Sequence, residues 1–253
     1  MRITHISDTH NKHNQLNGKL PGGNLLIHSG DFTSIGRKHE VEKFIEWFGK
    51  QDYTHKVFIA GNHDLVFDRE VLYRDKASTF EGRTFDDLPA KGKPEWLKQL
   101  LGNLPDSVYY LENSSVTIEG KNIWGSPYSP SFGYGWAFNK DRGADINEVW
   151  NDIPMDTDIV ITHTPIYGYN DRAQNTNQNV GCADLFYRLT EVKPHLHFAG
   201  HIHEAYGHKT MGLVDWYDLQ TFNGCSCNLR YEAENDPISF DYNFETGEIE
   251  FLM

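Results

Sequence analysis

The sequence predicts an α/β fold around a parallel β-sheet, and three observations support this prediction. Short apolar runs and an amphipathic helix follow one another near the start of the chain in the order strand, helix, strand, which is typical of parallel sheets. Most of the apolar runs end at a residue that can bind a metal ion. The chain has 253 residues, of which 38% are hydrophobic, so residues 1–253 are expected to form one domain with a substantial core.

Three apolar runs, residues 3–7, 25–29 and 57–60, are the predicted strands of the N-terminal part. Residues 14–24 are rich in Asn and Gly and are expected to form a loop. Residues 40–50 are predicted to be a helix, because apolar side chains recur at i, i+3, i+4 and i+7. In a unit of this kind, metal-binding residues that follow the strands lie at the carboxyl edge of the sheet.

The middle of the chain is predicted to contain a short helix and further strands. Residues 95–101 have a helical pattern, and residues 108–111, 115–118 and 122–125 are typical of consecutive strands, which predicts a meander in a second sheet. Residues 126–139 are dense in Pro, Gly and aromatic side chains, so a rigid loop is expected. Its aromatic side chains either pack on the sheet or stack on a nucleobase or aryl group of a ligand.

The C-terminal half alternates between predicted helices and strands. The helices are residues 146–150 and 183–192, and the strands are residues 159–162, 196–199 and two within 238–252. Residues 174–179 are rich in Asn and either rim a cleft or form a solvated turn. Arg142 and Arg172 are candidates for binding a phosphate, or are surface charges.

Charge and cysteine content limit the range of functions. The 36 acidic and 23 basic residues give a net charge of -13, which disfavours a nucleic acid polymer as partner. The three cysteines, Cys182, Cys225 and Cys227, are too few and too unevenly spaced for a disulfide framework, so a reducing, cytoplasmic location is expected. The chain opens directly on a predicted strand, and we expect no signal peptide and no membrane span.

Residues that can bind metal ions occur in five short motifs. Histidine nitrogen combined with carboxylate and carboxamide oxygen suits Mn, Fe, Co, Zn or Ni better than calcium. Two of the motifs contain ligands two residues apart, and side chains with this spacing point the same way along a strand. The motifs are Asp8-Thr9-His10, Gly30-Asp31, Gly61-Asn62-His63-Asp64, Thr162-His163-Thr164 and Gly200-His201-Ile202-His203.

A single histidine after a strand is more often structural than a metal ligand. The ordered set reverses that expectation and favours a two-metal site. The remaining histidines have no such support and are expected to be structural or exposed, with His28 nearest the site; they are His5, His13, His28, His39, His55, His195, His197 and His208.

The motif series resembles the complete motif set of the calcineurin-like metallophosphoesterases, in the order of that family. Further segments, residues 44–47, 59–63, 124–127 and 200–207, are similar to one subgroup. This subgroup contains the brain-expressed metallophosphoesterase-domain proteins of animals and their bacterial relatives, which resemble class III cyclic-nucleotide phosphodiesterases. Some animal members have glycine in place of His201, whereas this chain retains the histidine. The resemblance implies a four-layer α/β/β/α sandwich.

The resemblance also implies a role for each motif residue. Two divalent metal ions would each be held by one set of ligands. Mn is the first expectation for both, and Fe, Zn, Co or Ni are the others. Asp31 would bridge the ions, His63 would face the leaving group without binding metal, and Asp64 would orient His63. The first set is Asp8, His10 and His203, and the second is Asn62, His163 and His201.

The implied activity is metal-dependent hydrolysis of small phosphodiesters such as cyclic nucleotides. Two ions share a water and lower its pKa to roughly 7, so hydroxide can attack phosphorus in line while His63 protonates the leaving oxygen. The alternatives are a phosphomonoesterase or a nuclease on the same scaffold, and a nucleotide-binding regulatory protein with little turnover.

Overall fold

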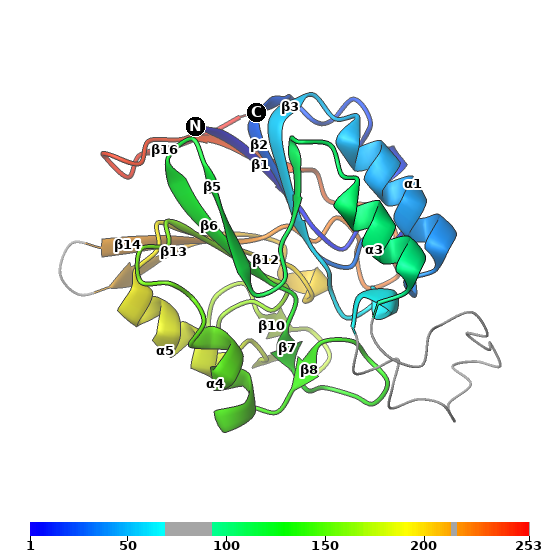
Figure 1. Ribbon diagram of the computed structural model, residues 1–253. Coiled ribbons are helices and arrows are strands. Elements are labelled where there is room, and N and C mark those ends of the chain that lie inside the picture. The colour runs from blue at the N-terminus through cyan, green and yellow to red at the C-terminus, as the bar shows by residue number, and fades with distance from the viewer. Residues whose placement is uncertain (69–92, 214–216, 253) are drawn as a thin grey trace.

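The protein forms four layers, in which two β-sheets pack face to face and helices cover both outer sides (Figure 1). The computed structural model describes residues 1–68, 93–213 and 217–252. Helices α1 (Lys38–Gly49) and α3 (Glu95–Gly102) cover one sheet, and α4 (Ala144–Trp150) and α5 (Ala183–Val192) cover the other. The predicted α/β/β/α sandwich is therefore confirmed.

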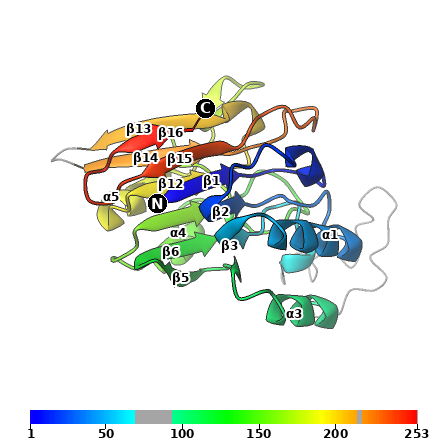
Figure 2. The same cartoon turned by 90° about the horizontal axis from the view of Figure 1, so that it is seen from above.

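The first sheet has six strands in the order β16-β15-β1-β2-β3-β4 (Figure 2). Strands β1 to β4 are parallel, as predicted for its N-terminal part, whereas β15 pairs antiparallel with β1 and β16 pairs antiparallel with β15. The strands are β1 (Arg2–Ile6), β2 (Gly23–Ser29), β3 (Tyr53–Ile59), β4 (Val108–Tyr110), β15 (Ile238–Tyr242) and β16 (Ile249–Phe251).

The second sheet also has six strands, in the order β13-β14-β12-β9-β6-β5. Its four inner strands are parallel, and the edge strands β13 and β5 run antiparallel to their neighbours. The strands are β5 (Ser114–Ile118), β6 (Lys121–Ser126), β9 (Ile159–Thr162), β12 (Leu196–Ala199), β13 (Gly207–Leu213) and β14 (Tyr217–Asn223).

Short elements lie in the loops around these sheets. In the described residues, two small sheets pair two strands each, and three single turns of 3-10 helix lie in the loops. They are β7 (Ser129–Pro130) with β8 (Asn139–Lys140), β10 (Arg172–Ala173) with β11 (Gln178–Asn179), η1 (His13–Leu16), η2 (Leu65–Phe67) and η3 (His203–Ala205).

The central parallel strands are apolar on both faces because each sheet lies between two layers. In β3, Phe58 packs under α1 while its neighbour Val57 faces the second sheet. In β9, Val160 packs under α4 and α5 while Ile161 faces the first sheet. Sandwiching of the sheets therefore explains why the strands show continuous apolar runs in the sequence.

The meander predicted for residues 108–125 is wrong. Strand β4 pairs parallel with β3 in the first sheet, so of the three predicted strands β5 and β6 alone pair as expected, as a hairpin in the second sheet. The chain passes between the sheets at Asn113, which has a φ of 48°, a left-handed conformation that asparagine tolerates well. Because both sheets bury the same kinds of residue, the apolar pattern of a short strand does not specify its sheet.

The helices and the other predicted strands agree with the prediction, but several strands were not predicted. They are the two short pairs β7 with β8 and β10 with β11, and the longer hairpin of β13 and β14, which pair over seven residue positions at the edge of the second sheet. None of the helices in the part of the chain that the structure describes is long and apolar enough to cross a membrane.

Candidate metal centre

The predicted metal ligands come together at the carboxyl edges of the two sheets. They occupy the turns that directly follow β1, β2, β3, β9 and β12. Three groups of side chains each offer ligand atoms that lie within 4.8 Å of one another. These groups are Asp8, His10 and His203; Asp8, Asp31 and His163; and His10, Asp31 and His63.

The ligands lie on turns rather than within strands, so the predicted placement of paired ligands along a strand is wrong. β1 ends at Ile6 and β12 ends at Ala199. Asp8, His10 and Asp31 have φ values of 49°, 40° and 55°, and His201 has a φ of 67°. Residues other than glycine rarely adopt this left-handed region, which costs energy and is concentrated at functional sites. The two-residue spacing places the ligands together through tight turns and not through strand pleating.

Three imidazole rings are oriented by backbone carbonyl groups. Nδ1 of His10, His163 and His203 lies 3.2, 2.9 and 2.9 Å from the carbonyl oxygens of Thr33, Ser29 and Asn228, respectively. Because a carbonyl oxygen only accepts hydrogen bonds, Nδ1 carries the proton in each ring. Nε2 is the nitrogen that faces the centre, as in histidines that bind metal.

The Nε2 atoms face other ligand atoms across short distances. Nε2 of His10 lies 3.2 Å from Nε2 of His203, and Nε2 of His163 lies 2.9 Å from Oδ1 of Asn62. The ring of His201 lies 4.9 Å from that of His163, measured between centroids. Asn62 and His201 therefore stand beside His163, although none of the three ligand groups above includes His201.

The two carboxylates suit a cationic centre. Asp8 is fully buried, and its Oδ1 has no hydrogen-bond partner although Nε2 of His203 lies 3.3 Å away. Asp31 belongs to two of the three ligand groups, and its Oδ2 lies 3.4 Å from Nε2 of His163 and 3.9 Å from Nε2 of His10. An unpaired buried carboxylate oxygen is costly, so a divalent ion fits this donor set.

Two motif glycines are required by the close packing of these ligands. A Cβ atom on Gly61 would lie 2.3 Å from Oδ1 of Asp31, and one on Gly200 would lie 2.1 Å from Oδ2 of Asp8. No side chain can be accommodated at either distance. The glycines therefore allow the backbone to approach the carboxylates.

Charge and burial separate the histidines into two kinds. Burial lowers the pKa of His10 to about 4 and that of His201 to about 3, so both rings are neutral. Burial also opposes protonation of His163 and His203, but Asp31 and Asp8 outweigh it and raise both pKa values to about 9. Without a metal ion, these two rings carry protons that compensate the buried carboxylates.

His63 is oriented by a carbonyl group. The resemblance implied that Asp64 orients this ring, and that expectation is wrong. Nδ1 of His63 lies 2.8 Å from the carbonyl oxygen of Ser34. The carboxylate of Asp64 instead accepts hydrogen bonds from the amides of Gly61, Asp31 and Thr33 and from the Thr33 hydroxyl. Asp64 therefore ties together the loops that carry Asp31 and Asn62, and affects His63 only through the backbone.

A cleft of about 260 Å³ opens over the ligands. Its walls include the rings of Phe132, Trp136 and Tyr231, and Trp136 lies 4.4 Å from the ring of His63 between centroids. The aromatic side chains of residues 126–139 are thus divided, some packing in the core and others lining the cleft. Phe138 is buried in the core under α1, whereas Phe132 and Trp136 face the cleft.

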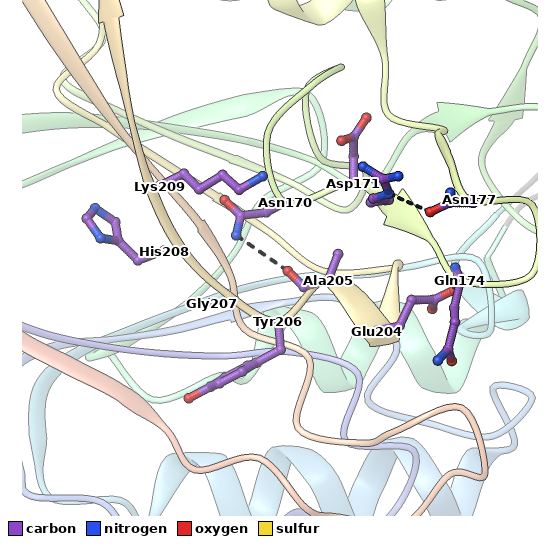
Figure 3. Close-up of a pocket in the computed structure, with 11 residues that line it drawn as sticks. Asn170, Asp171, Gln174, Asn177, Glu204, Ala205, Tyr206, Gly207, His208 and Lys209 are labelled. Atoms are coloured by element: carbon purple, nitrogen blue, oxygen red, sulfur yellow. Dashed lines mark hydrogen bonds between the residues drawn. The ribbon is translucent and has the colours of Figure 1, made fainter.

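A second pocket of about 460 Å³ lies beside η3, with Glu204 and Ala205 in its lining (Figure 3). Asn170 donates a hydrogen bond to the carbonyl group of Ala205 at its wall, and Glu204 lines both this pocket and the cleft. The Asn-rich residues form the tip between β10 and β11, where Asn175 lines the cleft. The segment is therefore a turn that also rims the cleft.

The arginines proposed as phosphate ligands are engaged elsewhere. Arg142 donates hydrogen bonds to the carbonyl groups of Gly181 and Val180, and Arg172 donates one to Oδ1 of Asn177. Neither lines the cleft over the metal ligands. His28, in turn, is buried among aromatic rings and bonds to Thr9, one residue away from two ligands.

The sequence did not reveal the part played by residues 223–231. Cys225 contacts Asp8, the carbonyl group of Asn228 accepts from His203, and the ring of Tyr231 lies 4.8 Å from that of His10. This segment therefore touches all three ligands of the first set. Its only signal in the sequence was the closely spaced pair Cys225 and Cys227.

Three comparisons relate the chain to known proteins. Residues 1–205 match the family described as Calcineurin-like phosphoesterase. The chain is 40% identical over 243 residues to metallophosphoesterase domain-containing protein 1 of Homo sapiens, covering 95% of this chain and 70% of that protein. It is 35% identical over 249 residues to UPF0046 protein T07D4.2 of Caenorhabditis elegans, covering 95% and 60%. The solved structure of TT1561 of Thermus thermophilus shares the fold, with a TM-score of 0.58 and 10% identity over 99% of this chain and 97% of that one.

Proposed function

The chain belongs to the calcineurin-like phosphoesterase family of metal-dependent phosphoester hydrolases, and from this premise we propose that it hydrolyses small phosphodiesters such as cyclic nucleotides. The observation that carries the proposal is the convergence of imidazole and carboxylate groups around Asp8 and Asp31, where Oδ1 of Asp8 has no hydrogen-bond partner and faces Nε2 of His203 at 3.3 Å. We also propose that residues 1–253 act as one domain. The three cysteines are buried free thiols, which supports a reducing, cytoplasmic location.

We assign the ligands to two half-sites that share Asp31. Asp8, His10 and His203 would hold one ion, and Asn62, His163 and His201 the other. Manganese is our first choice, and Fe, Zn, Co and Ni suit the same mixture of nitrogen and oxygen ligands. When bound, two such ions would neutralise charge on the phosphoryl oxygens and make a water molecule more acidic.

The proton for the leaving oxygen is assigned to Nε2 of His63. The carbonyl group of Ser34 accepts from Nδ1 of this ring, so in the imidazolium form Nε2 is the nitrogen that donates to the leaving oxygen. The ring lies within the ligand group of His10 and Asp31 and lines the cleft. A donor held there can act as a general acid without rearranging.

The cleft supports a small substrate with a planar group. Its volume of about 260 Å³ fits a small group, and the rings of Phe132, Trp136 and Tyr231 line it beside the reacting groups. Aromatic walls of this kind stack on a nucleobase or an aryl group. The net charge of -13 also disfavours nucleic acid polymers.

An assay with several substrates in the presence of Mn²⁺ tests the proposed function. It compares a bis-aryl phosphodiester, an aryl phosphomonoester, 2′,3′- and 3′,5′-cyclic nucleotides, and single-stranded DNA. The diesters with small planar groups should be turned over fastest. A strong preference for the monoester would contradict the phosphodiesterase assignment, and equal activity on DNA would favour a nuclease. Tight nucleotide binding with little turnover of any substrate would favour a regulatory protein.

A further inference from the structure

The thiol of Cys225 lies against the buried carboxylate of Asp8, although 217 positions separate the two residues in the chain. We propose that Cys225 is a positioning residue for the metal centre. Its thiol would hold Oδ2 of Asp8 so that Oδ1 is presented to the ion. This inference rests on the proposed function, because it presumes that Asp8 binds a metal ion.

The two oxygens of Asp8 have opposite surroundings. Oδ2 accepts hydrogen bonds from the Ser7 hydroxyl at 2.5 Å, the amide of His201 at 2.9 Å and the Cys225 thiol at 3.2 Å. Oδ1 has no hydrogen-bond partner. Three hydrogen bonds to Oδ2 fix the rotation of the carboxylate and leave Oδ1, which faces Nε2 of His203 at 3.3 Å, available as a ligand.

The thiol adds a third donor of a different strength to Oδ2. Ser7 Oγ has one proton to donate, and its short distance to Asp8, compared with 3.3 Å to the carbonyl oxygen of Gly30, assigns that proton to the carboxylate. A thiol is a weak donor, so it can orient Asp8 while withdrawing little charge from the carboxylate. A weak donor is therefore suited to a carboxylate that must still bind a cation.

The backbone of Cys225 is tied to the end of β1. The amide of Ser7 donates to the carbonyl group of Gly224 at 2.8 Å, and the amide of Ser226 donates to the carbonyl group of Ser7 at 2.8 Å. A Cβ atom on Gly224 would lie 2.6 Å from the ring of His5, so only glycine permits this approach. These contacts place the thiol beside Asp8.

Asn223 connects the same segment to the loop that carries His201 and His203. Its side-chain oxygen accepts a hydrogen bond from the amide of Cys225 at 3.1 Å. Its side-chain nitrogen donates to the carbonyl groups of Gly200 at 3.2 Å and Ile202 at 2.9 Å. Cys225 is therefore positioned by the same buried side chain that positions two of the proposed ligands.

The test measures Mn²⁺ binding by the full chain and not its turnover. Titration calorimetry on the parent, Cys225→Ala and Cys225→Ser gives a dissociation constant for each ion. Loss of a group that orients a ligand typically costs about 10- to 100-fold in metal affinity. We expect Cys225→Ala to weaken the binding of one Mn²⁺ ion to this extent and to leave the dissociation constant of the other within about twofold. Cys225→Ser keeps a hydrogen-bond donor and should recover part of the lost affinity. The matched control is Cys182→Ala, since Cys182 is equally buried but lies at the start of α5, where its thiol accepts from the amide of Leu185.

Unchanged affinity for both ions in Cys225→Ala would overturn the inference while leaving the proposed function intact. A parent that binds no Mn²⁺ would instead overturn the proposed function together with the inference. A measurement on the parent covers the case in which the alanine variant fails to fold. The infrared S–H stretching band of Cys225, assigned by its absence in Cys225→Ser, should shift when Mn²⁺ saturates the protein, because the ion draws charge from Asp8. A band that does not move would also overturn the inference.

Discussion

At the scale of single residues, hydrogen bonds to one atom of each candidate ligand decide which of its other atoms can face a metal ion. Carbonyl groups occupy Nδ1 of three ligand histidines, and three donors occupy Oδ2 of Asp8. The atoms left over face one another across the centre. Which atom of each side chain can bind a metal ion therefore depends on its hydrogen-bonded neighbours as well as on the residue type.

Replacing His63 by alanine should reduce kcat by about 100- to 10,000-fold, the usual contribution of a general acid. The number of Mn²⁺ ions bound should stay the same, because we assign no metal to this ring. Steady-state kinetics on a diester together with metal analysis checks both expectations. His39→Ala is the matched control, since His39 is exposed on α1. Turnover of an activated diester that survives in His63→Ala would show the assignment to be wrong.

Metal binding should release protons, because the raised pKa values of His163 and His203, each about 9, mean that both rings are protonated at pH 7. Only the neutral rings can bind an ion. Up to two protons should therefore be released at pH 7, and affinity for Mn²⁺ should rise as pH increases from 7 towards 9.

Calorimetric titration in buffers of different ionisation enthalpy measures this release. The observed enthalpy should change with the buffer at pH 7 and become less dependent on it above about pH 9. An enthalpy independent of buffer at pH 7 would contradict the protonated state of both histidines.

At this scale the candidate ligands could be predicted from the sequence, but the residues that orient them through hydrogen bonds could not. Each ligand follows an apolar run in a recognisable motif. The contacts of Cys225 with Asp8 and of Ser34 with His63 join residues that share no pattern, because they arise only when separate turns meet. The role given to Asp64 failed for the same reason.

At the scale of elements, the loop of residues 126–139 divides its aromatic side chains between core and cleft. Phe138 is only 2% exposed and packs in the core under α1, whereas Phe132 is 51% exposed at the cleft. Composition identified the loop, but the direction of each side chain depends on turns that composition does not specify.

Trp136→Ala should raise KM for diesters with a nucleobase or aryl group by about 10- to 100-fold, which corresponds to stacking of about 1–3 kcal/mol. A dialkyl phosphodiester, which offers no ring to stack, should be affected less than threefold. Tyr134→Ala is the control, because Tyr134 is 78% exposed and does not line the cleft. Equal effects of Trp136→Ala on both classes of diester would argue that the ring only supports the loop.

Strands were predictable where the sheet is buried on both faces and less so at its edges. β9 and β12 agree with the predicted residues, since their apolar runs are continuous. The edge strand β13 has partly polar sequence, GHKTMGL, and was not predicted. The position of β4 in the first sheet required knowledge of its partner β3.

At the scale of the whole molecule, the proposed ions would join the two sheets. Asp8, His10, Asp31 and Asn62 follow strands of the first sheet, whereas His163, His201 and His203 follow strands of the second. Ligands from both halves meet directly, as in the contact between His163 and Asn62. Bound metal should therefore stabilise the packing of one sheet on the other.

Removal of metal with EDTA should lower the Tm of the parent. Each ion present at about 100 times its Kd adds roughly 2.7 kcal/mol to the free energy of unfolding. Differential scanning calorimetry with Mn²⁺ and with EDTA measures the shift, and one cooperative transition is expected for residues 1–253. Asp31→Asn should lose most of the Mn²⁺-dependent shift. A Tm that is the same with Mn²⁺ and EDTA would contradict stabilisation by metal.

The most direct test of the proposed two-metal centre is anomalous X-ray diffraction from crystals grown with Mn²⁺. Two anomalous peaks should appear on either side of Asp31, one against Asp8, His10 and His203 and the other against Asn62, His163 and His201. His63 should contact neither peak through Nε2. A single peak, or one coordinated by His63 in place of a proposed ligand, would contradict the account.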